Sequence, residues 1–366
     1  MPSRKSRFLG SLLGVRITDA LGMPFENLTP EHILGLTGPE GVTTFWNPQQ
    51  RTDAPAWAQK LQVLSPGDYT DDWQLTQAGA RSLSHCGRVD LIHLAQEYVT
   101  EMHRSDLGWG GTTKRGVLEL SGWLNSDGTH GRIPGDFARF APNAKPGEGC
   151  GNGVAMRIAP FGLWSSNVFR YDGRAHPGAL SVFQKMIWDV GGLTHPDPRA
   201  TIGAYAVASL IAKIVAMDRK LETEDLLPLI DQAANEMILM EMRFASRVNM
   251  PRHTEGFSER FGWVKPLIQA DLTPEEIRQN LGTSCYTLES VPFSIATFLR
   301  HPTDFRAALK EAVEAGGDTD TNAAIVGSLV GANVGLEGIP PEWRNFRPDF
   351  AEAEHLGHDL YHATVP

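Results

Sequence analysis

Apolar residues along the chain are spaced as in α-helices in nearly every segment. After Asp90, apolar side chains recur at Leu91, Leu94 and Tyr98, the repeat of a helix that begins at an N-terminal Asp. Residues 199–217, "RATIGAYAVASLIAKIVAM", are apolar on almost every side, as a helix in the centre of a globular protein is. These two segments predict an amphipathic helix that begins at Asp90 and a buried helix.

Further segments repeat the pattern. Residues 223–248 and 285–301 are amphipathic, and each contains an early Pro at which the helix bends or which it tolerates. The N-terminal apolar run "FLGSLLGV" is interrupted by Arg16 and Asp19, which favours a first helix over a signal peptide.

Alternating strand patterns are nearly absent. Residues 41–46, "GVTTFW", are the only weak strand candidate. No shift in composition marks a linker, and Gly- and Pro-rich loops join the helical segments. We therefore expect one compact all-α domain over residues 1–366.

An uncharged helical segment, 322–334, directly follows two carboxylates in "AGGDTDTNAAIVGSLVGA". Buried carboxylates are unfavourable unless a basic side chain, a hydrogen-bonding cap or a metal ion neutralises them. One acid at a helix start needs only the cap, but Asp318 and Asp320 are two. An EF-hand is excluded, because Ala323 stands where Gly is required and Leu329 where the bidentate Glu belongs.

A second acidic segment, "YTDDWQL", lies far upstream. Another helical pattern follows directly after Thr70, Asp71 and Asp72. Taken by itself, this acidic segment is therefore also explained as the capped start of a helix. Taken together, the two segments supply four carboxylates and two Thr hydroxyls, an all-oxygen set that suits magnesium or manganese. Four negative charges balance two divalent ions, so the pattern favours a dinuclear site between two helix N-termini.

Composition and charge limit the classes of partner that we expect this protein to bind. The chain has 33 Lys and Arg against 43 Asp and Glu, a net charge of −10, and no basic tract, so we expect neither nucleic acid nor an acidic membrane as partner. The uncharged stretch 321–336 is shorter than the ~20 residues of a membrane span. The three scattered cysteines, Cys86, Cys150 and Cys285, form no zinc or disulfide pattern, which favours a cytoplasmic protein.

Two glycine-rich segments are candidates for substrate contacts. "GEGCGNGVAMRIAPFG" (147–162) opens a helix, and its backbone amides could cradle phosphate. It lacks the Lys-Ser/Thr ending of a Walker loop and follows no strand, so it is neither a P-loop nor a Rossmann motif. "DLGWGGTTKRG" (106–116) could flank a nucleotide. His195 is expected to cap or pack at a helix start, and Glu26 lies on a Gly-Pro turn after the first helix.

The order of these segments resembles the ADP-ribosylglycohydrolase family, which includes dinitrogenase reductase-activating glycohydrolase. The resemblance is carried by "GVRITDALGMPFE", "YTDDWQL", "GWGGTT", "GNGVAMRIAPFG", "LTHPDPRA" and "FLRHPTDFRAALKEAVEAGGDTDTNAAIVGSLVGA", which cover nearly the full length. It implies the family's orthogonal multi-helix fold and a binuclear magnesium or manganese centre.

The resemblance also assigns residues. It implies metal ligands at Thr70, Asp71, Asp72, Asp318, Asp320 and Thr321, and it places the family's acidic residue, on a loop near the substrate, at Glu26. In the hydrolysis that we expect, Asp71 or Asp72 relays the proton of the water, and Glu26 either orients the substrate or protonates the leaving group. The substrate loops fall on Gly149, Cys150, Gly151, Asn152 and Gly153, and on Gly108, Trp109, Gly110 and Gly111.

This chain departs from the family pattern at three places. Trp73 stands where a small residue is common, Cys150 stands where Ser or Tyr is common, and residues 42–66 are rich in Pro and Gln. The expected activity is metal-dependent hydrolysis of the bond between ADP-ribose and an arginine or serine side chain of a protein. The alternatives are a hydrolase of a free N- or O-riboside, with Trp73 stacking on the base, and an inactive binding or structural relative. A monomer or small homo-oligomer is expected.

Overall fold

The computed structural model describes residues 1–51, 58–125, 149–244 and 255–364. Its helices in the first half are α1 (Arg4–Gly22), α2 (Pro30–Thr37), α3 (Asp71–Cys86), α4 (Leu91–Arg104), α5 (Gly111–Leu124), α6 (Ala159–Trp164), α7 (Ala179–Gly192) and α8 (Pro198–Ala216). The second half contains α9 (Thr223–Phe244), α10 (Phe257–Phe261), α11 (Val264–Gln269), α12 (Pro274–Leu281), α13 (Thr287–Arg300), α14 (Phe305–Glu314), α15 (Thr319–Val334), α16 (Pro341–Arg344) and α17 (Ala351–Thr364).

Short 3-10 turns join several helices: η1 (Met23–Phe25), η2 (Pro48–Gln50), η3 (Ala58–Val63), η5 (Asn152–Val154), η6 (Ser165–Val168), η8 (Leu336–Gly338) and η9 (Pro348–Phe350). The described residues contain no β-strand, only isolated bridges between Gly151 and Tyr286 and between Phe169 and Ala175. The all-α expectation is confirmed. The weak strand candidate at 41–46 is wrong, because these residues form a loop.

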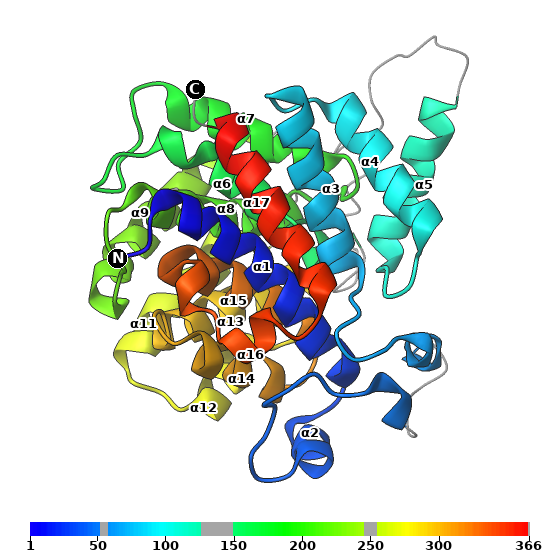
Figure 1. Ribbon diagram of the computed structural model, residues 1–366. Coiled ribbons are helices and arrows are strands. Elements are labelled where there is room, and N and C mark those ends of the chain that lie inside the picture. Colours follow the sequence, from blue (N-terminus) through cyan, green and yellow to red (C-terminus); the bar gives the residue numbers. More distant parts are fainter. Residues whose placement is uncertain (52–57, 126–148, 245–254, 365–366) are drawn as a thin grey trace.

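The closest helix pair in the core is α1 and α15, which lie side by side in Figure 1. A Cβ atom at Gly14 would lie 2.2 Å from the carbonyl oxygen of Gly327, and one at Gly331 would lie 2.1 Å from that of Gly10. Glycine is therefore required where the two backbones touch. This packing brings the end of α1 to the start of α15, where Thr319 Oγ1 donates to the carbonyl of Gly22 at 2.8 Å.

Helix α8 is the other central element. By length and composition it could cross a membrane, but 94% of its apolar window is buried inside the protein, as in the core helix of a globular protein. Asp197 caps it by accepting from the Arg199 backbone N–H. The prediction of a buried helix at 199–217 is thereby confirmed.

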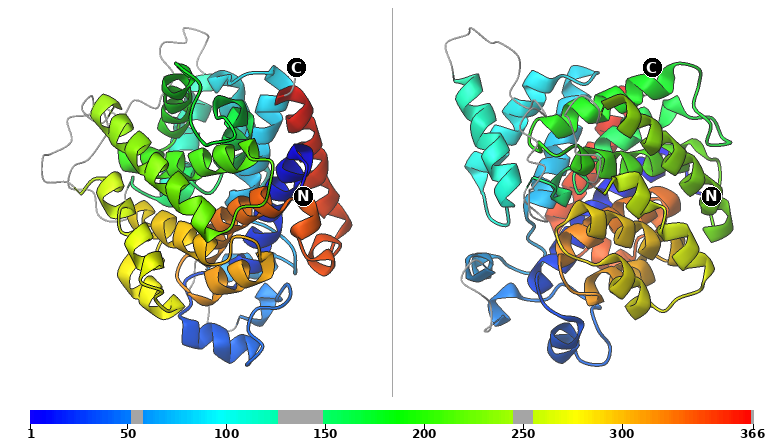
Figure 2. Two further views of the ribbon diagram at one scale, coloured as in Figure 1. Left: turned by 90° about the vertical axis from the view of Figure 1, so that its left-hand side faces the viewer. Right: turned by 180° about the vertical axis from the view of Figure 1, so that it is seen from behind.

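Helix α3 packs against α1, α4, α6 and α17. The predicted cap of α4 is present, since Asp90 accepts from the backbone N–H groups of Ile92 and His93. Helices α9 and α13 contain Pro228 and Pro292 within their length, as expected for helices that tolerate an early Pro. Figures 1 and 2 show α2 at one end of the helical body, beyond the end of α1.

Candidate metal centre

Asp318 stands at the N-terminus of α15 but does not cap it. Its side chain makes no capping hydrogen bond and instead accepts from the side-chain amide of Asn152, with Nδ2 and Oδ2 2.8 Å apart. The preceding Gly316 and Gly317 have φ of 72° and 77°, a conformation that favours glycine. The cap-only explanation of this acidic segment therefore does not fit the geometry.

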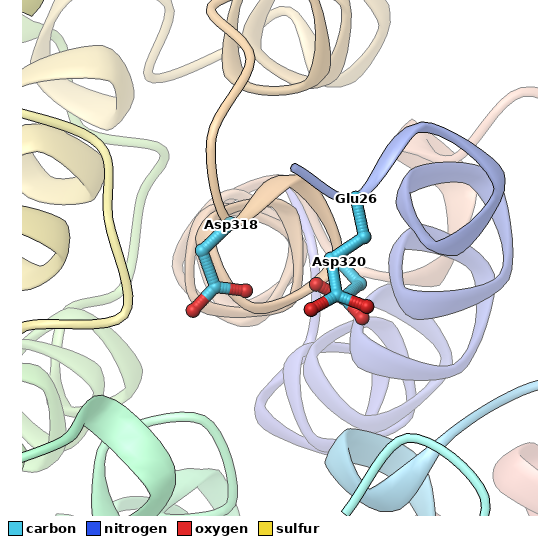
Figure 3. Close-up of side chains that lie close together, drawn as sticks. All are labelled: Glu26, Asp318 and Asp320. Carbon is cyan, nitrogen blue, oxygen red and sulfur yellow. The ribbon is translucent and has the colours of Figure 1, made fainter. Parts of the chain in front are cut away.

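The same turn fixes Glu26. The backbone N–H of Asn27 donates to the Gly317 carbonyl at 2.6 Å, and that of Gly317 donates to Leu28 at 3.0 Å. These bonds hold the loop after α1 against the turn before α15. As a result, Glu26, Asp318 and Asp320 each place one carboxylate oxygen within 4.8 Å of the others. Figure 3 shows the Glu26 and Asp320 carboxylates next to each other, with Asp318 on the turn beside them.

The first acidic segment is positioned by Asp19 on α1. This buried carboxylate accepts from the Thr70 hydroxyl at 2.8 Å and from the backbone N–H groups of Thr70 and Trp73, each at 3.0 Å. The bonds set the start of α3, so that Asp71 and Asp72 occupy its first turn. Thr321 Oγ1 lies 3.4 Å from Asp72 Oδ2 and thereby links α15 to α3.

Burial is the main influence on the pKa values of these carboxylates. It raises the pKa of Glu26 to about 8, with the charges of Asp318 and Asp71 acting in the same direction and Arg51 opposing them. Burial, with Asp19 beside it, raises the pKa of Asp71 to about 8. The pKa values of Asp72 and Asp320 are also raised well above their ordinary range by burial and by neighbouring carboxylates. Bound protons can neutralise these carboxylates, as the raised pKa values indicate, and a divalent cation bound among them would neutralise them instead.

A divalent metal ion fits these residues. Asp72 Oδ1 is buried and has no hydrogen-bond partner among the described residues, so that one carboxylate lone pair remains available for a ligand. The surrounding donors are carboxylate and hydroxyl oxygens, a set preferred by magnesium and manganese. The acidic cluster of Glu26, Asp318 and Asp320 could therefore hold a metal ion.

The two glycine segments adjoin this cluster. Gly108 has φ of 81°, and a Cβ there would lie 2.7 Å from Thr70 Cβ. The backbone N–H of Gly110 donates to Asp71 Oδ2 at 3.4 Å. The Trp109 indole donates to Gln74 Oε1 at 2.5 Å. This loop therefore packs directly on the start of α3.

The other segment is held to the start of α13. The backbone N–H of Asn152 donates to Cys285 and that of Thr287 donates to Cys150, both at 3.0 Å. The bonds surround the Gly151–Tyr286 bridge. Within this segment Gly149 and Gly153 are described, whereas Gly147 and Glu148 lie outside the described residues.

Comparison with known proteins agrees with this architecture. The family profile described as ADP-ribosylglycohydrolase matches residues 1–366. The chain belongs to the ADP-ribosylglycohydrolase family. It is 26% identical to the ADP-ribosylhydrolase ARH3 of Gallus gallus, over 97% of this chain and 93% of that protein. It is 23% identical to the ADP-ribosyl-[dinitrogen reductase] glycohydrolase of Rhodospirillum rubrum, over 93% of this chain and 90% of that protein. A solved structure named ADP-ribosylglycohydrolase-related protein complex matches with a TM-score of 0.59 at 23% identity, covering 99% of both chains, and shows the fold.

Two side chains of this family member, Trp73 and Cys150, lie differently from what the sequence suggested, and a third, His195, lies as expected. The Trp73 indole is 1% exposed, so its faces are covered by protein and do not offer a stacking surface for a base. The Cys150 thiol is fully buried, and burial with the nearby Asp197 charge raises its pKa well above its ordinary value. Any substrate contact of Cys150 is therefore left to its backbone. His195 packs as expected, with Nδ1 2.9 Å from Thr194 Oγ1.

The sequence reasoning gave no site role to Asp19, Arg51 or Cys285. Asp19 positions Thr70 and Trp73 from within α1. Arg51 is buried, and its charge acts on Glu26. Cys285 lies close enough for the Asp318 and Glu26 charges to act on its thiol, whose pKa is raised to about 11, mainly by burial. Asp19 lies within the quoted segment "GVRITDALGMPFE", but nothing in its pattern distinguished it, and Arg51 and Cys285 are isolated loop residues, so the fold is what reveals their positions.

Proposed function

We propose that this protein hydrolyses the glycosidic bond between ADP-ribose and a modified protein side chain of the arginine or serine type, with magnesium, or alternatively manganese, as cofactor. The observation that carries the proposal is the convergence of Glu26, Asp318 and Asp320 on one buried point. Membership of a family of ADP-ribosyl hydrolases supports the substrate class. The scattered free cysteines support a cytoplasmic location.

The proposed ligands come from the two acidic segments. They are Thr70, Asp71, Asp72, Asp318, Asp320 and Thr321, joined by Glu26, whose carboxylate lies with those of Asp318 and Asp320. Divalent ions bound by these residues would polarise ribose hydroxyls and water. Thr70 can contribute a hydroxyl lone pair because its proton is donated to Asp19.

The carboxylate side chains are proposed to transfer the protons of the reaction. Hydrolysis adds water to the anomeric carbon and releases the protein side chain, which must gain a proton, through a transition state with positive charge on the ribose ring. Asp71 or Asp72 would take the proton from the attacking water. Glu26 is half-buried, whereas Asp71, Asp72, Asp318 and Asp320 are buried. Glu26 is therefore the carboxylate best placed to exchange a proton with the leaving group.

Substrate contacts are proposed for the two glycine segments. The backbone of 149–153 lies beside Asp318 through Asn152, and the loop at 108–111 lies beside Asp71 through Gly110. Both would contact the diphosphate and nucleoside of ADP-ribose through backbone amides. Gly149 and Gly108, each with φ of 81°, give the turns their shape.

The test is incubation of the protein with Mg²⁺ and each of three substrates: an ADP-ribosyl-arginine peptide, an ADP-ribosyl-serine peptide and a set of simple ribosides. We expect the wild-type protein to release ADP-ribose from one of the two peptides. The Asp320→Asn protein should no longer release it. Release of ribose or base alone would instead indicate a riboside hydrolase. No release from any substrate would favour an inactive relative. Unchanged turnover in Glu26→Gln protein would contradict the proton role of Glu26.

A further inference from the structure

Four of the chain's 12 histidines line one open pocket, at the end of α3 opposite to Asp71 and Asp72. The pocket has a volume of about 820 Å³ and is lined by residues of α3, α4 and α17. Its histidines are His85, His93, His358 and His362, and Glu97 and Asp359 add carboxylates. Figure 1 shows α17 alongside α3. We call this set the histidine pocket.

The histidines already stand in two pairs. His358 and His362 are one helical turn apart on α17, with ring centres 4.3 Å apart and ring planes at 51°. His85 at the end of α3 and His93 on α4 have ring centres 4.8 Å apart. Two imidazoles on one tetrahedral zinc ion, with Zn–N of about 2.0–2.1 Å, have ring centres about 5 Å apart. The spacing of the His358–His362 pair is therefore close to that of two histidines on a shared metal ion, whereas the His85 and His93 rings are stacked, with planes at 14°, so that one of the two supplies a ligand.

The ring nitrogens are open to a ligand. His85, His358 and His362 are exposed, and His93 is half-buried. His93 Nδ1 lies 3.1 Å from Ser82 Oγ. In the tautomer that carries its proton on Nδ1, His93 donates to Ser82 and leaves the Nε2 lone pair free, the arrangement usual for metal-bound histidines. On α17, the Asp359 carboxylate lies 3.6 Å from His358 Nδ1.

We propose that the histidine pocket binds a transition-metal ion of the zinc or nickel class, held by the His358–His362 pair and completed by His93 or His85. No three ligand atoms of the pocket lie within 4.8 Å of one another in the described residues, so the third ligand is recruited by rotation of exposed side chains. Imidazole nitrogen selects metals different from those that the oxygen-only acidic cluster prefers. The ion would join α17 to α3, the helix whose opposite end carries Asp71 and Asp72.

The charges around the pocket fit a cation. Glu97 is paired with Arg81 at 2.8 Å, and Asp359 is exposed. The pocket therefore offers imidazole nitrogens with one exposed carboxylate, a donor set that suits a divalent transition-metal ion. This site does not depend on the proposed hydrolase function.

The experiment is a Zn²⁺ titration by calorimetry of full-length protein in excess Mg²⁺, which fills the acidic centre. Wild type should bind one Zn²⁺ per chain. His358→Ala/His362→Ala and His85→Ala/His93→Ala proteins should bind it at least tenfold more weakly. His355→Ala is the matched control, since His355 is exposed on the same helix but does not line the pocket. It should bind as wild type does.

Two results would overturn the site. One is Zn²⁺ binding that is unchanged in both double variants or weakened equally in His355→Ala. The other is loss of the Zn²⁺ isotherm in Asp318→Asn/Asp320→Asn protein, which would place the ion in the acidic centre. A second readout is the thermal midpoint, which should rise with Zn²⁺ in wild type and His355→Ala and stay constant in both double variants.

Discussion

Asn152 donates its side-chain amide to Asp318 across 2.8 Å, although 166 positions separate the two residues. The bond ties the glycine segment 149–153 to the turn that carries the acidic cluster. The backbone N–H of Asn152 donates to the Cys285 carbonyl, just before α13, which holds the residue close to Asp318. The proposed substrate loop and the proposed metal centre are therefore one structural unit.

We expect Asn152→Ala to weaken metal binding about 10- to 100-fold, the usual effect of losing a partner that orients a metal ligand. Without the amide, Asp318 loses its hydrogen bond and its fixed direction. Mn²⁺ affinity by calorimetry checks this. Asn235→Ala, a change at an exposed position of α9, is the control and should leave the affinity unchanged. Equal affinities in the two variants would contradict a role for the Asn152 side chain.

Gly108→Ala is predicted to disturb the centre through Thr70. The new Cβ would lie 2.7 Å from Thr70 Cβ, at a φ of 81° that other residues rarely adopt. Thr70 and Asp71 must then shift, and we expect hydrolysis to fall at least tenfold. The control is Gly122→Ala, where no atom lies within 4 Å of the added Cβ. A helical Gly to Ala change there should stabilise by about 0.5–1 kcal/mol. Full activity in Gly108→Ala would show that the loop tolerates the shift.

The stability of the metal-free protein should fall as pH rises. The folded-state pKa values of Glu26 and Asp71 lie near 8, above ordinary values of 4.5 and 3.8. The folded state therefore retains protons that the unfolded chain releases, and the free energy of unfolding declines between about pH 4 and pH 8. Each retained proton contributes about 1.4 kcal/mol per pH unit.

Thermal midpoints in EDTA between pH 5 and pH 8 test this dependence. Because metal ions displace those protons, the rise in midpoint caused by Mg²⁺ should grow with pH. Asp72→Asn/Asp320→Asn protein should show a flatter pH profile in EDTA. A metal-free midpoint that rises steadily from pH 5 to pH 8 would contradict the assignment of raised pKa values.

Trp73 is expected to act on stability rather than on substrate choice. Its side chain is 1% exposed, and truncation of a buried Trp to Ala costs about 3–5 kcal/mol. Trp73→Phe should lower the thermal midpoint while the KM for the preferred substrate stays within about twofold. Trp263→Phe, at a 45% exposed position, is the control and should change neither the thermal midpoint nor the KM. A large change in KM without a change in midpoint would restore the stacking interpretation.

The sequence predicted the elements that depend on local patterns. The apolar repeat after Asp90 and the all-round apolar segment 199–217 correspond to α4 and α8. The pairing of Asp71 and Asp72 with Asp318 and Asp320 followed from charge balance, and Thr321 bonds to Asp72 in the fold. That residues 1–366 form a single domain stays a prediction.

Tertiary relationships could not be read from the sequence. Glu26 joins Asp318 and Asp320 only because Asn27 and Leu28 pair with Gly317 through backbone atoms, which no side-chain pattern reports. The burial of Trp73 depends on how α3 packs in the core, and Asp19 on α1 sets the start of that helix by accepting from the Trp73 backbone N–H. Both depend on the close approach of α1 and α15, which is a property of the assembled core.

The most direct test of the account is the number of Mn²⁺ ions bound per chain, measured by electron paramagnetic resonance of the free ion alongside hydrolysis of an ADP-ribosyl peptide. We predict two ions in the wild-type protein and metal-dependent release of ADP-ribose. Asp318→Asn/Asp320→Asn protein should lose both together. Unchanged Mn²⁺ stoichiometry and unchanged hydrolysis in that variant would contradict the claim that this acidic cluster is the metal centre of a hydrolase.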